Sequence, residues 1–538
     1  MRAYRTSFGA AITLGLCVAL KPEIGAAQGT RDNLGSVSFP ISCTAEQAKF
    51  DHAIALLHNF YYPETTKAFQ EIIKDDPECG MAYWGLAMSL RPNPLVPPFP
   101  ATLQKAGWEA VEKGKMARTQ SPKEAAYIGA METFYKDYDT VDQHVRTKAY
   151  EQAMSDLHTK YPDDSEGAIF YALSLLEAVD LSDKTYASQL KAAGILNEQA
   201  KTHPNHPGIA HYLIHSYDFA PLAALCLPTA HLYDKIASDS PHALHMPSHI
   251  YSMLGMWDDS IRSNLASEAL ADRYAEKHYP DATDAQVPHD LDFMMYAYLQ
   301  QAKDDDAQKL IDKATQIKKM IVVRLTVDTA LAAIPARYVV EREDWKQAAK
   351  LTVRDSQYPA AQSITYFIRA LGAARSGDVA AARAEVAHLD DMEARLITSK
   401  DGYWAKQTLI QKSAVEAWIT FAEGKRDEAI ASMRKAADLD DKSEKNVAME
   451  NKLLPIRALL GDLYLAAGMN KDALRELEQS LKVAPNRYAS IAAAAAAARA
   501  DGQTDTAKRY YRALAALAVD GNQERPELVE ASKYLALK

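Results

Sequence analysis

Several motifs that mark common enzyme classes are missing from this 538-residue sequence. It contains no glycine-rich phosphate-binding loop, no Gly-x-Ser-x-Gly nucleophile motif and no His-Glu-x-x-His zinc motif. It also has no alternation of apolar and polar residues long enough to build a β-sheet. These absences argue against P-loop nucleotide hydrolases, α/β-hydrolases and zincin metalloproteases, and they favour an all-α fold.

Long apolar runs and an excess of basic residues are absent as well. Beyond the N-terminal segment, no run reaches the roughly 18 apolar residues that a membrane-spanning helix needs. The formal net charge is −10, and it becomes −12 without the first 27 residues, which carry three cations and one anion. An acidic chain lacks the basic surface that binds phosphate backbones, so we expect no nucleic-acid partner. The composition, 48% hydrophobic and 25% charged, predicts a chain folded throughout.

The N-terminus has the order of a secretory signal peptide. Arg2 and Arg5 precede the apolar run 8–20, and three small residues follow at 25–27. We expect cleavage after this stretch, no membrane span in the mature chain, and a periplasmic or secreted location. An oxidising compartment favours a disulfide. The cysteines that remain after cleavage are Cys43, Cys79 and Cys226.

A 34-residue period is visible near the C-terminus. In 454–485, six residues occupy the consensus positions 8, 11, 15, 20, 24 and 32 of a tetratricopeptide repeat: Gly461, Tyr464, Gly468, Ala473, Leu477 and Pro485. In such a repeat, small residues lie where helices A and B of a hairpin touch, large apolar residues fill the seam, and proline ends helix B. Partial copies follow at 502–511 and precede at 424–436. The C-terminal part therefore strongly resembles the tetratricopeptide repeat superfamily.

This resemblance implies an all-α, right-handed solenoid of tetratricopeptide-like helical hairpins, with the A helices lining a concave groove. We divide the chain into a signal peptide at 1–27, an N-terminal extension at 28–44, N-terminal repeats at 45–200, histidine-rich repeats at 201–320, degenerate repeats at 321–440, and consensus-like repeats with a C-terminal cap helix at 441–538. In this register Cys43 and Cys79 each lie just before consecutive A helices, which makes them the preferred disulfide pair. Cys226 is expected as a buried, inert thiol.

Ten of the 15 histidines lie between residues 203 and 289. Within the pairs His211/His215 and His245/His249 the residues are four apart, and the pairs are one full repeat apart. Residues i and i+4 share one helix face, so each pair projects its two imidazoles together. The register places both pairs at helix A positions that typically face the groove in tetratricopeptide proteins. Further candidates for groove or ligand contact are His242, His289, Asp292, Tyr296 and Trp84.

The paired histidines predict a metal site, because helices packed about 8–10 Å apart can bring such pairs onto one ion. The expected ligands are His211, His215, His245 and His249. Imidazole suits zinc, copper or iron. Three ligands and an open position would permit catalysis, with Asp290, Asp292 or Tyr296 handling protons or orienting ligands. Two other interpretations stay open: histidines that hydrogen-bond carbonyl groups in helix seams, and a groove that binds an acidic peptide without metal.

Four segments together resemble a group of exported bacterial tetratricopeptide proteins of uncharacterised function: 50–64, 76–89, 206–218 and 245–255. The superfamily implies binding of peptides or partner proteins in the concave groove, and it implies no catalysis. We therefore expect an exported solenoid that binds a peptide, a protein partner or a small ligand in this groove, with a histidine metal site. The alternative is a periplasmic metalloenzyme that uses the histidine pairs on adjacent A helices.

Overall fold

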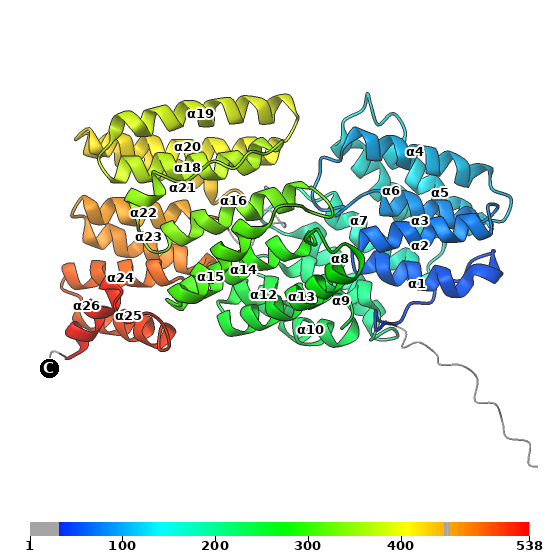
Figure 1. Cartoon of the computed structure of the whole chain (residues 1–538), viewed down its shortest axis with the longest axis horizontal. Helices are drawn as coiled ribbons and strands as arrows, with labels where there is room; N and C mark the ends of the chain where they lie inside the picture. Colours follow the sequence, from blue (N-terminus) through cyan, green and yellow to red (C-terminus); the bar gives the residue numbers. More distant parts are fainter. Residues whose placement is uncertain (1–31, 446–448, 450–451, 537–538) are drawn as a thin grey trace, which may run out of the picture. The chain divides into compact units, whose positions relative to one another are not determined.

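The computed structural model describes residues 32–445, 449 and 452–536. Regular structure in these residues is helical, and no strand forms among them (Figure 1). Asn33–Lys538 form one compact unit. No helix among the described residues is long and apolar enough to cross a membrane. The expected signal peptide, 1–27, lies outside the described residues.

The N-terminal repeats begin with a short 3-10 turn and continue as helical hairpins, in which each helix packs on the next. Their elements are η1 (Thr44–Glu46), α1 (Gln47–His58), α2 (Tyr62–Asp75), α3 (Gly80–Ser89), α4 (Ala101–Met116), α5 (Pro122–Tyr135), α6 (Gln143–Lys160), α7 (Ser165–Glu177) and α8 (Ala187–Ala200). The odd-numbered helices are the A helices of this part, and α3 also contacts α1 and α5. The repeats are therefore stacked through their A helices as well as paired within each hairpin.

The middle repeats continue the same order with one change, because the A helix of one repeat is divided in two. The elements are α9 (Pro207–Tyr217), α10 (Ala223–Ile236), α11 (Pro241–His245), α12 (Pro247–Leu254), α13 (Trp257–His278), α14 (Gln286–Gln300), α15 (Asp304–Gln316) and α16 (Leu325–Val340). Here α9, α12, α14 and α16 are consecutive A helices in contact. The division falls at Pro247, which has no backbone N–H to donate and restricts the residue before it.

The C-terminal repeats end in a single terminal helix. The elements are α17 (Trp345–Ala348), α18 (Pro359–Arg375), α19 (Val379–Thr398), α20 (Gly402–Ala422), α21 (Arg426–Asp440), α22 (Ile456–Ala466), α23 (Asn470–Val483), α24 (Tyr488–Ala500), α25 (Thr504–Leu517) and α26 (Pro526–Ala536). Helices α18, α19 and α20 pack side by side, and α20, α22 and α24 continue the A series. The predicted all-α solenoid of helical hairpins is confirmed.

Close helix contacts explain the consensus residues. A Cβ atom on Gly461 of α22 would lie 2.6 Å from Cγ of Leu477 on α23, so only glycine lets these helices approach this closely. Gly85 of α3 has the same relation to the Phe69 ring of α2. Gly468 lies in the turn that follows α22. Its φ of +74° is a backbone conformation that favours glycine. The tetratricopeptide-like spacing therefore follows from helix contact and from turn geometry.

Contacts between repeats that are distant in the sequence cover the histidine-rich section. Helix α1 packs on α9, and α24 packs on α14. The Trp257 indole N–H donates to the Asn486 carbonyl oxygen at 3.1 Å, and Arg487 pairs with Glu341 at 2.9 Å. Helices α9 and α14 are buried along almost their whole length. The A helices that carry the histidines therefore do not line an open groove, which differs from the sequence-based expectation.

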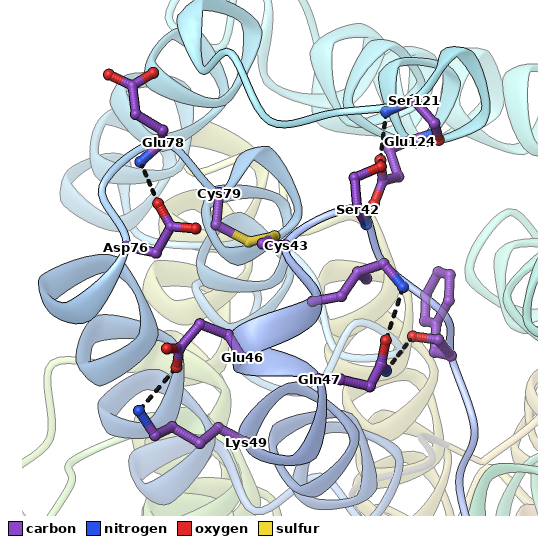
Figure 2. The surroundings of a disulfide bond; sticks show 12 residues. Ser42, Cys43, Glu46, Gln47, Lys49, Asp76, Glu78, Cys79, Ser121 and Glu124 are labelled. Carbon is purple, nitrogen blue, oxygen red and sulfur yellow. Dashed lines mark hydrogen bonds and ion pairs between the residues drawn. A yellow bond between two sulfur atoms is a disulfide. The ribbon is translucent and has the colours of Figure 1, made fainter.

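The first two A helices are joined by a disulfide between Cys43 and Cys79 (Figure 2). Cys43 directly precedes η1 and Cys79 directly precedes α3, with 5.6 Å between their Cα atoms. The neighbouring Ser42 backbone N–H donates to a Glu124 carboxylate oxygen at 2.6 Å, so the segment that precedes η1 also contacts α5. Cys226 is a buried free thiol on α10, and burial raises its pKa.

Replacing both Cys43 and Cys79 by serine should lower the free energy of unfolding by about 2–4 kcal/mol, because the bond closes a loop with a sequence separation of 36 residues. Urea unfolding followed by circular dichroism measures the change. Tris(2-carboxyethyl)phosphine should shift the midpoint of the wild-type protein and leave the double variant unchanged. An unchanged wild-type midpoint would show that the bond contributes nothing to stability.

Candidate metal centre

Six histidines from three successive repeats lie close together in the buried part of the histidine-rich repeats. Their imidazole nitrogens form two groups, each with its ligand atoms within 4.8 Å of one another. The first triad is His211, His215 and His242. The second triad is His245, His249 and His289. The four expected metal ligands are thus brought together, but they are divided between two triads, and each triad gains a third histidine from the following repeat.

The local chain sequence explains how three A helices deliver these side chains. Pro207 and Pro241 occupy the first turns of α9 and α11, where a missing N–H costs no helical hydrogen bond. Pro247 then separates α11 from α12, yet the His249 backbone N–H still donates to the Met246 carbonyl at 3.1 Å. The tight turn keeps His245 and His249 on the same side, although they belong to different helices.

Within each predicted pair the two imidazoles face each other. The Nε2 atoms of His211 and His215 are 3.0 Å apart, and those of His245 and His249 are also 3.0 Å apart. A neutral imidazole has one N–H donor and one lone pair, so the partner at Nδ1 determines which of them Nε2 presents. The contacts at Nδ1 therefore decide the chemistry of each pair.

In the facing pair of the second triad, His245 and His249, oxygen acceptors hold the proton at Nδ1. His249 Nδ1 lies 2.8 Å from an Asp218 carboxylate oxygen. His245 Nδ1 lies 2.6 Å from Asn264 Oδ1 and 3.0 Å from an Asp290 carboxylate oxygen. The Asn264 amide nitrogen donates to the Ser260 carbonyl, which leaves its oxygen to face the imidazole. Both Nε2 atoms consequently present lone pairs, and these lone pairs face each other at 3.0 Å.

An extra proton between these two lone pairs is unfavourable at neutral pH. Desolvation by burial lowers the pKa of His245 to about 4 and holds the pKa of His249 well below its usual range. The same cause lowers the pKa of His242 to about 3. The pKa values of the remaining three triad histidines are also far below normal, chiefly through burial: His211, His215 and His289. The imidazoles are therefore neutral and free of competing protons, as metal ligands must be.

A second layer of side chains orients the second triad. Asp218 accepts from His249 and also from the Lys445 ammonium at 2.7 Å, so a residue far along the chain completes this contact. Burial raises the pKa of Asp218, and the nearby Lys445 ammonium opposes that rise. Such carboxylate–histidine pairs are typical of protein metal sites, where they fix the tautomer and the ring orientation.

A third cluster, next to the first triad, is held together by hydrogen bonds to Glu166 and Tyr212. Glu166 uses one carboxylate oxygen for His58 Nε2 at 3.0 Å and the other for His206 Nε2 at 2.9 Å. The Tyr212 hydroxyl lies 2.9 Å from His58 Nδ1. Burial opposes ionisation of Glu166, but His206 and His58 hold its pKa well below the ordinary value. These contacts satisfy the carboxylate and both His58 nitrogens. The cluster also positions the His58 carbonyl, which accepts from His211 Nδ1 at 2.6 Å.

Three predicted groove residues lie outside the centre. Asp292 is buried and pairs with Arg337 at 2.7 Å, and Tyr296 packs against the Trp257 ring with 5.4 Å between centroids. Trp84 lies in an interior aromatic cluster with Tyr127. The structure therefore assigns these side chains to packing, whereas the predicted candidates His242 and His289 belong to the triads.

Several supporting residues escaped the sequence analysis. Asp218 had a weak local signal, since it follows His215 by three residues at the end of the same helix. Asn264 lies on α13, a helix B, where the repeat register gave no reason to expect a contact. Lys445 lies 227 residues from Asp218, so only the fold reveals it.

The comparisons with known proteins add little to this geometry. No family model matches the chain, and no curated protein matches it. A solved structure described as "Structure of Naa15/Naa10 bound to HypK-THB" aligns with 91% of this chain and 96% of that chain, at 13% sequence identity and a TM-score of 0.23. A TM-score this low carries no argument, so the tetratricopeptide-like fold rests on the helix packing and consensus contacts described above.

Replacing Glu166 by glutamine should lower the free energy of unfolding by about 2–4 kcal/mol, because an amide cannot accept from both buried imidazoles. Urea denaturation of the two proteins measures the difference. Glu198→Gln is the matched control, since Glu198 forms an exposed ion pair with Lys201 and should change stability by less than about 0.5 kcal/mol. Equal effects of the two substitutions would contradict a structural role for the buried network.

Proposed function

We propose that this chain is a metal-binding helical-repeat protein whose second triad holds a transition-metal ion. One observation carries the proposal: His245 and His249 direct two Nε2 lone pairs at each other across 3.0 Å, with both Nδ1 protons engaged by oxygen acceptors. A cation bound by both nitrogens turns this repulsive contact into an attractive one. His289 supplies the third ligand.

The ligand set favours zinc or copper. Three neutral imidazoles suit first-row metals, whereas calcium and magnesium require oxygen ligands. Zinc–nitrogen bonds of about 2.0–2.1 Å join nitrogens that lie as close as the Nε2 atoms of His245 and His249. Three protein ligands and a free fourth position also characterise catalytic zinc sites. This is the basis for keeping the metalloenzyme alternative, although no reaction is assigned.

Export is part of the same proposal. The N-terminal charge, apolar run and small residues at 1–27 suggest delivery to the periplasm or beyond. A compartment outside the cytosol also suits the disulfide between Cys43 and Cys79. Both features support a protein that acquires its metal outside the cytosol.

Metal-free protein should bind zinc or copper at the second triad, and His289→Ala should weaken this binding by about 100-fold or more, since even the loss of an outer residue costs 10–100-fold. A chelating indicator dye in competition with the protein measures the affinity. Free metal at 100 times the dissociation constant should stabilise the wild-type fold by about 2.7 kcal/mol, seen as a higher melting temperature.

His388→Ala is the control for this experiment. His388 is exposed on α19 and stacks on Tyr366, with 4.6 Å between ring centroids, so its loss should leave metal affinity unchanged. The proposal fails if wild type and His289→Ala withdraw equal amounts of metal from the dye with equal affinity, or if neither binds it.

A second candidate function is ligand binding in a cleft beside the centre, as the superfamily resemblance suggests. The cleft has a volume of about 580 Å³, enough for a few side chains of a peptide. The cleft is lined by apolar and charged side chains. The lining includes Tyr186, Phe219, Pro221, Met253, Val483 and the charged Arg457. Asp218 and Lys445 also line it, so an occupant would lie next to the outer layer of the second triad.

Ala220→Trp should abolish peptide binding in this cleft, because Ala220 is part of its lining and an indole would fill the space. Selection of a phage-displayed peptide library on wild-type protein, followed by isothermal titration of a selected peptide, measures the loss. Ala101→Trp, at the exposed start of α4, is the matched control and should retain affinity. Selected peptides that bind both variants equally would place binding elsewhere.

A further inference from the structure

The first triad, like the second, has two imidazoles whose Nε2 atoms lie 3.0 Å apart and a third imidazole from the next repeat, and the two triads are adjacent. We infer that together they form one centre for two transition-metal ions, three imidazoles to each ion, with a small cavity between them that takes an anionic exogenous ligand such as hydroxide or azide. This inference rests on the proposed metal binding by the second triad.

Two of the three histidines of the first triad, His211 and His242, present lone pairs for the same reason as the facing pair of the second triad. In contrast, His215 Nδ1 has no hydrogen-bond partner among the described residues. His211 Nδ1 donates to the His58 carbonyl oxygen at 2.6 Å, an atom that only accepts, so His211 Nε2 carries a lone pair facing His215 Nε2. His242 Nδ1 lies 3.1 Å from Gln286 Oε1. The His242 Nε2 atom is buried and has no hydrogen-bond partner among the described residues. Two ligand atoms of this triad are thereby prepared for a cation.

One hydrogen-bonded chain orients histidines of both triads. The Gln286 amide nitrogen donates to an Asp290 carboxylate oxygen at 2.8 Å, which turns the amide oxygen toward His242. The same Asp290 oxygen lies 3.0 Å from His245 Nδ1. A single Gln286–Asp290 pair, both on α14, therefore fixes the tautomer of His242 in the first triad and supports that of His245 in the second.

The imidazoles of the two triads lie next to each other, and the three imidazoles of each triad contact one phenylalanine ring. Ring centroids are 6.2 Å apart for His215 and His249 and 5.9 Å apart for His242 and His245. The Phe60 ring lies 4.4–6.0 Å from all three imidazoles of the first triad. Phe293 lies 4.6–5.1 Å from all three of the second. The repeated arrangement argues for two equivalent metal positions and against one ion shared by six histidines.

A cavity of about 40 Å³ lies between the triads. His215 and His242 line it from the first triad, and His249 and His289 from the second. This volume exceeds the roughly 10–15 Å³ that one water molecule needs. Arg324 also lines the cavity, and its Nε is buried without a hydrogen-bond partner in the described chain. The positive charge of Arg324, together with the two proposed metal ions, would favour the binding of a small anion in the cavity.

Metal-free full-length protein should take up two zinc ions per chain in equilibrium dialysis with elemental analysis. His242→Ala and His289→Ala should each take up one, and His388→Ala should take up two. His215→Ala repeats the first-triad test in case His242→Ala does not fold, and circular dichroism checks the fold of every variant.

The possible outcomes separate the two proposals. One ion in wild type that is lost in His289→Ala but kept in His242→Ala overturns the two-ion centre and leaves the second-triad site intact. One ion that is lost in both variants also overturns it, in favour of a shared ion. No ion in wild type overturns both proposals.

Copper and azide test the cavity. With two copper(II) ions bound, the electron paramagnetic resonance of the wild-type protein should show magnetic coupling between them. Weak coupling gives a half-field signal, and strong antiferromagnetic coupling through a bridging anion removes the copper signal. Azide should add a charge-transfer absorption band, and Arg324→Leu should weaken azide binding by about tenfold or more through loss of a charge-assisted hydrogen bond. A copper signal that integrates to two isolated ions per chain, or equal azide affinity in Arg324→Leu, would overturn the shared anion-binding centre.

Discussion

Hydrogen bonding at one nitrogen of an imidazole decides what the other nitrogen can offer, and the candidate centre depends on this constraint. The oxygen atoms of Asp218, Asn264 and Asp290 hold protons at Nδ1 of His249 and His245, and the His58 carbonyl does the same at Nδ1 of His211. Without these acceptors the facing nitrogens could simply share a proton, and the histidines would form ordinary packing contacts. Burial reinforces the constraint, because it disfavours the charged imidazolium that would otherwise relieve two facing lone pairs.

The repeat architecture supplies the geometry that such a cluster requires. A 34-residue period returns the chain to an equivalent place on the next A helix, so a pair on α9 is followed by a pair at the α11–α12 junction. An open stack would leave these pairs in water. In this structure both pairs are buried, and α1 and α24, which are distant in the sequence, pack on α9 and α14. Repetition thus aligns the ligands, and contacts between distant repeats supply the low-dielectric surroundings.

Much of the fold was predictable from the sequence, because consensus positions report short-range contacts. Gly461 against Leu477, and the cysteines preceding η1 and α3, follow from the repeat register alone. The histidine pairs were predictable from i and i+4 spacing. Their division into two triads was not, since it depends on how His242 and His289 turn toward different pairs. Burial was also missed, because the repeats that cover these helices lie far away in the sequence and leave no local pattern. The repeat consensus predicted the positions of the A helices in the sequence, but it did not predict which distant repeats pack on them.

The ion pair between Asp218 and Lys445 joins the candidate centre to a distant part of the chain. All six triad histidines precede residue 290, yet the ammonium that steadies Asp218, and through it His249, belongs to the segment after α21. All six candidate ligands are therefore synthesised well before the lysine that completes the outer layer. If the second triad binds a metal as proposed, its outer layer is complete only after the segment that follows α21 has packed against the end of α9.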